Sequence, residues 1–163
     1  MSPDERRRDV REDNAGIKNM TVGTVLKNKG NAIVAVEDAA TVLEIAEIIT
    51  SRRIGAVLVL GKDPPVAGIV SERDVVKAVA RQPDKVLTLR ADDLMTRNVI
   101  TATPETSVDT AMAIMDAHYF RHLPVLDRGK LVGIISIRDL VKYRIMLHEH
   151  DVDSLKAYIA RQV

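Results

Sequence analysis

The chain has 163 residues, and 24 Lys and Arg against 23 Asp and Glu give it a formal net charge of +1. This balance argues against a general polyanion binder, and the length fits one domain or two small ones that share a core. Aromatic residues make up only 2% of the sequence, so we expect an aliphatic core. The absence of Cys excludes disulfides, thiolate metal sites and cysteine nucleophiles.

The N-terminal residues are charged and are not followed by the apolar run of a secretory signal. We therefore expect residues 1–19 to be a mobile arm. The Arg6–Arg8 cluster is surrounded by acidic residues, which argues against nucleic-acid binding. No stretch approaches the roughly 18 apolar residues of a membrane helix, so we expect a soluble, cytoplasmic protein that contacts no membrane.

Residues 32–80 and 98–145 follow the same pattern of predicted elements. Each half opens with a short β-like segment, at 32–36 and at 98–102. Apolar residues at helical spacing then predict one helix in each half: Val42, Ile45, Ala46 and Ile49 in the first, and Val108, Ala111, Met112 and Met115 in the second. These two stripes fit a core position or a contact with a second copy equally well.

A predicted hairpin and a second helix complete each half. The hairpins cover residues 56–70 and 123–135, and the helices cover Glu72–Ala80 and Arg138–Arg144. The unit is thus β-α-β-β-α, used twice, and neither copy of about 50 residues buries much surface alone. We predict an α+β fold in which the two repeats pack sheet to sheet with pseudo-two-fold symmetry.

This pattern divides the chain into five parts. They are a flexible arm at 1–19, a first repeat at 20–80, a linker and lead-in at 81–96, a second repeat at 97–145, and a C-terminal helix at 146–163. The residues at 21–26 and 92–96 look alike, as if each repeat had its own lead-in helix.

Two copies of one short motif carry a family resemblance. The motifs are Gly68-Ile-Val-Ser-Glu-Arg-Asp74 and Gly133-Ile-Ile-Ser-Ile-Arg-Asp139, accompanied by Met95-Thr96 and Phe120-Arg-His-Leu-Pro-Val125. Together, over about residues 20–145, they resemble a tandem pair of cystathionine β-synthase (CBS) domains, the Bateman module. The resemblance implies regulation rather than catalysis. It also implies two clefts for adenosine-type ligands: AMP first, then ADP, ATP or NAD(H), or S-adenosylmethionine.

The resemblance implies a role for each motif residue. Ser71 and Ser136 begin helices, where a hydroxyl and unpaired backbone N–H groups favour a phosphate. Asp74 and Asp139 are placed one turn later to accept hydrogen bonds from both ribose hydroxyls. Further expected ligand contacts are Gly68 and Gly133, where a missing Cβ permits close approach, Arg73 and Arg138 for phosphate, and Val34, Ala35 and Thr101 for the adenine ring.

The two halves differ at one position that matters for phosphate binding. Arg121 and His122 stand where the first half has Gly55 and Ala56, so only the second half supplies cationic donors there. From the resemblance, we expect them to serve the cleft that contains Asp74. A salt bridge or a surface turn is the alternative interpretation.

The same motifs also allow interpretations without a ligand. Each Ser-x-x-Asp is also a plain capping box, so the rival function is a ligand-free module for dimerisation and interaction. No histidine pair has convincing metal-ligand spacing, and no nucleophile-elbow or P-loop motif is present, so we expect no metal, no obligatory cofactor and no catalysis. We expect a homodimer that signals to a protein partner in trans.

Overall fold

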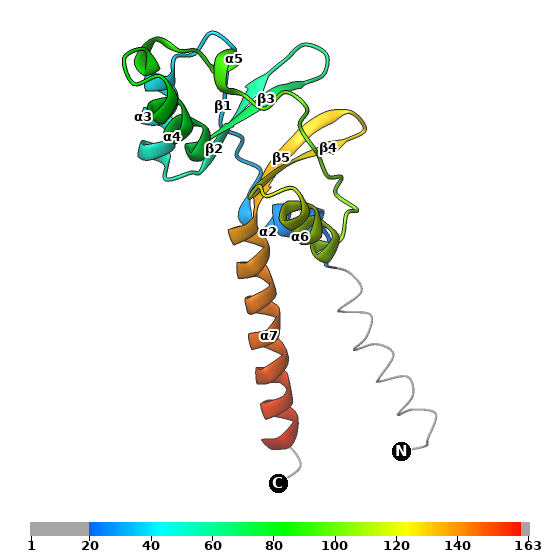
Figure 1. The fold of residues 1–163 in the computed structure, drawn as a ribbon. Helices are drawn as coiled ribbons and strands as arrows, with labels where there is room; N and C mark the ends of the chain where they lie inside the picture. The colour runs from blue at the N-terminus through cyan, green and yellow to red at the C-terminus, as the bar shows by residue number, and fades with distance from the viewer. Residues whose placement is uncertain (1–19, 161–163) are drawn as a thin grey trace. The chain divides into compact units, whose positions relative to one another are not determined.

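The structure, a computed structural model, describes residues 20–160, so the predicted arm at 1–19 lies outside the described residues. The chain forms two compact units, each built from segments far apart in the sequence (Figure 1). Among the described residues, unit 1 contains 20–30, 103–121 and 135–160, and unit 2 contains 31–102 and 122–134. The predicted α+β class is confirmed, and the first repeat has the predicted β-α-β-β-α order. The second repeat has the order α-β-β-α among the described elements.

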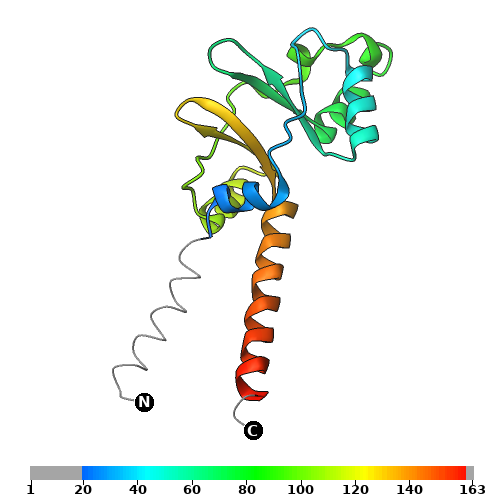
Figure 2. The same ribbon diagram turned by 180° about the vertical axis from the view of Figure 1, so that it is seen from behind.

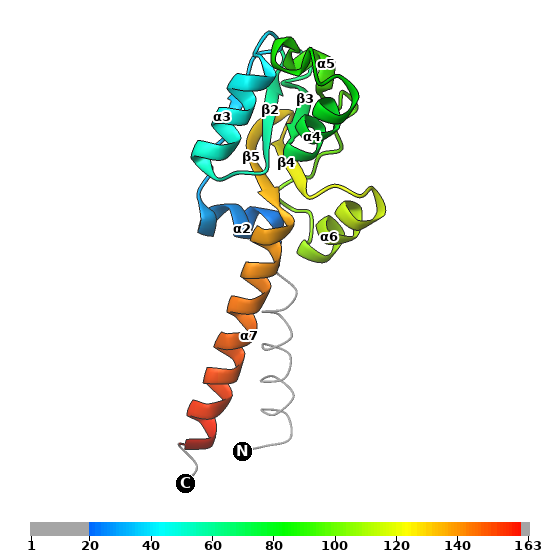
Figure 3. The ribbon, with the colours of Figure 1, turned by 60° about the vertical axis from the view of Figure 1, so that its left-hand side comes forward.

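Unit 2 contains residues 31–80 of the first repeat. Its elements are β1 (Ala35–Val36), α3 (Val42–Arg52), β2 (Ala56–Leu60), β3 (Val66–Ser71), α4 (Glu72–Arg81), the short 3₁₀ helix η1 (Val86–Thr88) and α5 (Ala91–Leu94). Strand β2 lies in the middle of the sheet, parallel to β1 and antiparallel to β3. Helices α3 and α4 contact each other and these strands (Figure 3).

Helix α3 begins where the sequence predicts a capping box. The Thr41 hydroxyl accepts from the Glu44 backbone N–H at 3.3 Å, and the Glu44 carboxylate accepts from the Thr41 N–H at 2.7 Å. Hydrogen bonds from the backbone and the side chain of Thr41 hold the pKa of Glu44 below its usual range. The helix ends at Arg53, whose φ of 53° is left-handed.

The predicted apolar stripes lie inside the single chain. Val42, Ile45 and Ile49 of α3 are buried, and so are Val108 and Met115 of α6 (Val108–Ala117). In unit 2, buried residues of α3 pack with β1, β2 and β3 in an aliphatic core. Because these side chains are already covered, they belong to the core, whereas Ala46 and Met112 of the same stripes are half-buried.

Unit 1 consists mainly of three helices. Helix α7 (Ile137–Ala160) contacts both α2 (Val22–Lys29) and α6, and the C-terminal half of α7 continues past them (Figure 2). The hairpin of β4 (His122–Asp127) and β5 (Lys130–Ser136) leads directly into α7. Within residues 20–160, no helix is both long and apolar enough to cross a membrane.

Two predicted elements differ from the structure. The opening strand at 98–102 is reduced to a single bridge, in which Ala102 pairs with Val125 through hydrogen bonds to Pro124 and Leu126 of 2.9 Å each. The separate helices predicted at 138–144 and 146–159 are one helix, α7. No Gly or Pro stands between the two segments, so nothing stops the first helix.

Each lead-in segment pairs with the other repeat. In unit 1, Thr21 bridges Ser107 at the start of α6, and the Val22 N–H donates to the Thr106 carbonyl at 2.8 Å. In unit 2, Thr41 at the start of α3 bridges Arg90 of the second lead-in. The lead-in of the first repeat therefore folds with the second repeat, and the lead-in of the second repeat folds with the first.

Candidate ligand sites at two helix starts

The first predicted motif forms the start of α4 in unit 2. The Asp74 carboxylate accepts hydrogen bonds from the Ser71 backbone N–H at 2.9 Å and from the Ser71 hydroxyl at 2.6 Å. The Glu72 N–H donates to the Gly55 carbonyl at 3.0 Å, which ties the helix start to the turn before β2. Both Ser71 and Asp74 are half-buried. A serine hydroxyl and a carboxylate thus stand together at a helix N-terminus.

The second motif repeats this arrangement at the start of α7 in unit 1. Asp139 accepts from the Ser136 N–H at 2.8 Å and from the Ser136 hydroxyl at 2.9 Å. The Ile137 N–H donates to the Arg121 carbonyl at 2.9 Å, which is the equivalent of the bond between Glu72 and Gly55. The two motifs are therefore equivalent in their local bonding as well as in their sequence.

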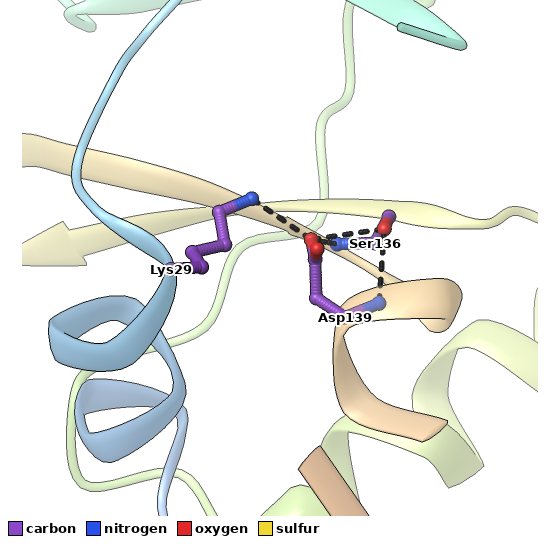
Figure 4. Close-up of polar contacts among 3 residues, drawn as sticks. All are labelled: Lys29, Ser136 and Asp139. Atoms are coloured by element: carbon purple, nitrogen blue, oxygen red, sulfur yellow. Dashed lines mark hydrogen bonds and ion pairs between the residues drawn. The ribbon is translucent and has the colours of Figure 1, made fainter. Parts of the chain in front are cut away.

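One side chain distinguishes the second motif. The Lys29 ammonium, at the end of α2, lies 2.8 Å from Oδ2 of Asp139 (Figure 4). Partial burial raises the pKa of Asp139, but hydrogen bonds from Lys29 and Ser136 and the charge of Lys29 outweigh it, so this pKa lies below its usual range. We refer to Lys29, Ser136 and Asp139 as the second site.

A histidine of the second repeat lies beside the first motif. A Cβ atom built on Gly55 would lie 2.7 Å from Cε1 and 3.0 Å from Nε2 of His122, so the imidazole packs directly on this glycine. Gly55 in turn accepts the hydrogen bond that anchors the start of α4. The structure thus brings His122 to the turn that holds the first motif, within unit 2. We refer to Ser71, Asp74 and His122 as the first site.

The residues predicted to hold an adenine ring lie at the beginning of each repeat, in unit 2. The Val34 carbonyl accepts from the Leu58 N–H at 3.2 Å, and Ala35 pairs with Leu58 in the sheet. Thr101 directly precedes the bridging residue Ala102. Val34, Ala35 and Thr101 are all half-buried, so each keeps part of its surface accessible.

Gly68 packs against the side chain of Met95. A Cβ atom at this position would lie 2.5 Å from Sδ and 2.9 Å from Cβ of Met95, so the missing Cβ makes room for the Met95 side chain. The predicted contact of Gly68 with a ligand stays a prediction. Met95 packs against the core of unit 2 and is adjacent to Thr96, which bridges Ile69. The equivalent Gly133 is buried in β5.

The three predicted arginines are all exposed. Arg73 lies in the first turn of α4 and Arg138 in the first turn of α7, each next to the motif aspartate. Arg121 belongs to unit 1, whereas its neighbour His122 belongs to unit 2. His122 thus lies in the unit that contains Asp74, and Arg121 lies in the unit that contains Asp139. The expectation that both side chains serve the first site stays a prediction.

Sequence reasoning missed Lys29 as a site residue. The helix that carries it precedes the first repeat, and no motif links it to Asp139, which is 110 positions later. Its position depends on the exchange of the lead-in segments, for which the sequence holds no signal. The comparison of the two repeats identifies Gly55 only as the counterpart of Arg121, so the sequence does not predict its contact with His122.

Comparisons with known proteins agree with the two-repeat pattern of the sequence. The family model described as "CBS domain" matches residues 30–81 and 91–145. The mitochondrial CBS domain-containing protein CBSX3 of Arabidopsis thaliana is 30% identical over 168 residues, which cover 97% of this chain and 81% of that protein. The predicted resemblance to a tandem pair of CBS domains is confirmed.

Solved structures show the same similarity. A CBS-domain containing protein from Agrobacterium tumefaciens is 41% identical, with a TM-score of 0.73 over 76% of this chain and 98% of that chain. A CBS domain protein from Pyrobaculum aerophilum, complexed with AMP, is 32% identical, with a TM-score of 0.68 over 79% of this chain and 96% of that chain.

Proposed function

Because the chain belongs to the CBS domain family, we propose that it is a regulatory module that binds an adenine nucleotide, without catalysis, and signals this binding to a protein partner. AMP is the first ligand to test, followed by ADP, ATP and NAD(H). The observation that carries the proposal is the duplicated pairing of a serine and an aspartate at the starts of α4 and α7. The AMP complex of the relative from Pyrobaculum aerophilum supports this choice of ligand.

In the proposed complex, each site uses its helix start for phosphate. The first backbone N–H groups of a helix have no partner within the helix, and the helix dipole favours a negative charge there. Ser71 and Ser136 add a hydroxyl at this point, and Asp74 and Asp139 supply the acceptors for the two ribose hydroxyls. His122 stands close enough to α4 to add a donor at the first site.

We also propose that the chain forms a homodimer through α7. Val141, Ile145 and Val152 are 41%, 53% and 48% exposed, and their spacing of four and seven residues places them along one stripe of the helix. An apolar stripe on one copy matches the same stripe on a two-fold-related copy. In a dimer of this kind, ligand binding to one chain would change the position of the second chain or of a partner protein docked on it.

The alternative function is a ligand-free interaction module. It is favoured by one observation: each motif aspartate already accepts two hydrogen bonds from its own serine, as expected for a helix cap. Under this alternative, the motifs contribute only to stability and the family's ligand has no effect.

Calorimetric titration with AMP, together with thermal unfolding, tests the proposal. At 100 times its Kd, a ligand adds about 2.7 kcal/mol of stability, a rise in Tm of about 5–10 °C for a chain of this size. We expect Asp74→Asn and Asp139→Asn each to remove binding at one site, and the double variant to remove it entirely.

A matched control separates ligand binding from helix capping. Asp93 caps α5 by accepting from the Arg90 N–H at 2.9 Å, but it belongs to neither site. Asp93→Asn should lower stability without changing the affinity for AMP. If the unaltered protein, free of co-purified nucleotide, binds none of AMP, ADP, ATP and NAD(H), the ligand-free module is the better description.

A further inference from the structure

At the second site, a lysine from a separate helix pairs with the motif aspartate. At the second site, one carboxylate oxygen, Oδ2 of Asp139, accepts from the Lys29 ammonium, the Ser136 N–H and the Ser136 hydroxyl, at 2.8, 2.8 and 2.9 Å (Figure 4). The side chains of Lys29 and Asp139 are only 28% and 25% exposed. This partial burial makes the ion pair less screened than a fully exposed one.

At the first site, the ion pair found for Asp74 is of another kind. Lys77 is the cation near Asp74, but its ammonium is 3.9 Å from Oδ1, it lies one turn further along the same helix, and its side chain is 57% exposed. By contrast, Lys29 reaches Asp139 from another helix, α2, which the exchange of lead-in segments brings to α7. The two sites are therefore alike in their serine and aspartate, but the lysine that pairs with the aspartate comes from another helix at the second site and from the same helix at the first.

The ion pair has a consequence for any ligand that uses Asp139. A ribose that donates its two hydroxyls to this carboxylate competes with the Lys29 ammonium for Oδ2. The displaced ammonium then loses its charge-assisted hydrogen bond, which is unfavourable. The side chain has a flexible four-carbon stem, so a phosphate on the same ligand can provide the new partner.

Resting on the proposed function, we infer that Lys29 makes the second site selective for ligands that carry a phosphate, so that it favours adenine nucleotides over adenosine. Lys29 acts here as a specificity residue: it holds the carboxylate until a ligand arrives and then moves to the phosphate. A ligand without a phosphate must break the ion pair and leaves the ammonium without an anion.

The test compares AMP with adenosine at the second site alone. In the full chain carrying Asp74→Asn, which removes the first site, the affinities for both ligands are measured by calorimetry with and without Lys29→Met. Lys29→Met removes the charge but keeps a stem of similar length. We expect the preference for AMP over adenosine to fall by roughly tenfold, because AMP loses a charge-assisted hydrogen bond and adenosine no longer has to displace the ammonium.

Two further variants serve as controls. Lys27→Met removes an exposed lysine from the same helix, two positions away, and should leave the preference unchanged. Lys29→Arg keeps a positive charge and should retain most of the preference for AMP. Thermal unfolding of each variant without ligand confirms that it is folded at the temperature of the titration.

The possible outcomes separate this inference from the proposed function. If Lys29→Met raises or lowers both affinities by the same factor, the inference is wrong and the proposed function stands. The same conclusion follows if the Asp74→Asn protein binds neither ligand while the unaltered protein binds AMP. If the unaltered protein binds no adenine nucleotide at all, both proposals fail.

Discussion

At the scale of single residues, the contact between Gly55 and His122 gives the most direct test of the first site. A Cβ atom on Gly55 would lie 2.7 Å from Cε1 of His122, at the far end of a side chain that can rotate away. We expect Gly55→Ala to weaken AMP binding at the first site severalfold with little loss of stability, since it moves one donor worth about 1 kcal/mol.

Calorimetry on the Asp139→Asn background measures this effect. His122→Ala should produce a loss of similar size, and adding Gly55→Ala to it should cost little more, because both changes remove the same contact. Fully additive losses would contradict the idea that Gly55 acts through His122.

Asp139 predicts how stability depends on pH. Its pKa in the folded protein lies below its usual range, so the ionised carboxylate stabilises the fold at every pH above the unfolded-state pKa of about 3.9. This contribution is lost as the pH falls through the lowered pKa of the folded state. Urea unfolding of the unaltered protein and of Asp139→Asn should therefore differ at pH 6 and converge as the pH falls towards 2.

The control for this prediction is Asp116→Asn, which changes an exposed carboxylate of α6 and should track the unaltered protein at each pH. A difference between the unaltered protein and Asp139→Asn that stays constant from pH 6 to pH 2 would show that the effect of Asp139 is not electrostatic.

Gly68 predicts a packing effect. In Gly68→Ala, the new methyl group would lie 2.9 Å from Cβ of Met95, an atom too close to the backbone to move freely. Overpacking of this kind costs about 1–3 kcal/mol, which urea unfolding would detect. Adding Met95→Ala should make the glycine substitution nearly neutral. If Gly68→Ala costs the same with Met95 and with Ala at that position, the assigned contact is wrong.

At the scale of elements, the exposed stripe of α7 is the proposed contact of the homodimer. Ile145→Asp places a charge in the middle of the exposed stripe, and we expect it to convert the dimer to a monomer in sedimentation or light-scattering measurements. Met146→Asp is the control, since Met146 is 47% exposed on the same helix but lies outside the stripe. If Ile145→Asp leaves a dimer intact, the contact does not run through this stripe.

Helices with clear start signals could be predicted from the sequence almost to the residue. Thr41 with Glu44 and Ser71 with Asp74 mark the starts of α3 and α4 because each pair satisfies the first N–H groups of its own helix. The strand at 98–102 was overpredicted, because a run of β-formers forms a strand only where a neighbour pairs with it, and here Ala102 alone does so.

The same contrast applies to the candidate sites. Ser71, Asp74, Ser136 and Asp139 belong to a local motif, so their arrangement follows from three-residue spacing on a helix. The positions of Lys29 and Met95 depend on where a separate lead-in helix packs, and this packing rests on a few backbone hydrogen bonds and apolar contacts between distant segments. No residue pattern in either segment encodes its partner.

At the scale of the whole molecule, the exchange of lead-ins predicts which part of the fold depends on the N-terminal helix. Residues Val22, Val25 and Leu26 of α2 are at most 4% exposed, and the Val108 N–H at the start of α6 donates to the Met20 carbonyl at 2.8 Å. Deleting residues 1–30 should therefore expose the amides of α6 and of the first turns of α7 to hydrogen exchange, while β1, β2 and β3 stay protected.

Mass-spectrometric hydrogen exchange on this deletion, with deletion of residues 1–19 as the control, measures the effect. The opposite result, in which the strands of the first repeat lose protection and α6 keeps it, would show that each lead-in serves its own repeat.

The hydrogen bonds of the lead-in segments also make domain swapping between two molecules feasible. The pairing of Thr21 with Ser107 requires that both segments be present, but not that they belong to one polypeptide. Two chains folding together at high concentration can therefore trade their first helices and satisfy every one of these bonds in a domain-swapped pair. Such a pair must unfold α2 to separate, so it persists on dilution, whereas a dimer held only by the surface of α7 dissociates freely. If the proposed dimer through α7 forms, we expect the protein concentration during refolding to decide which of the two forms is obtained.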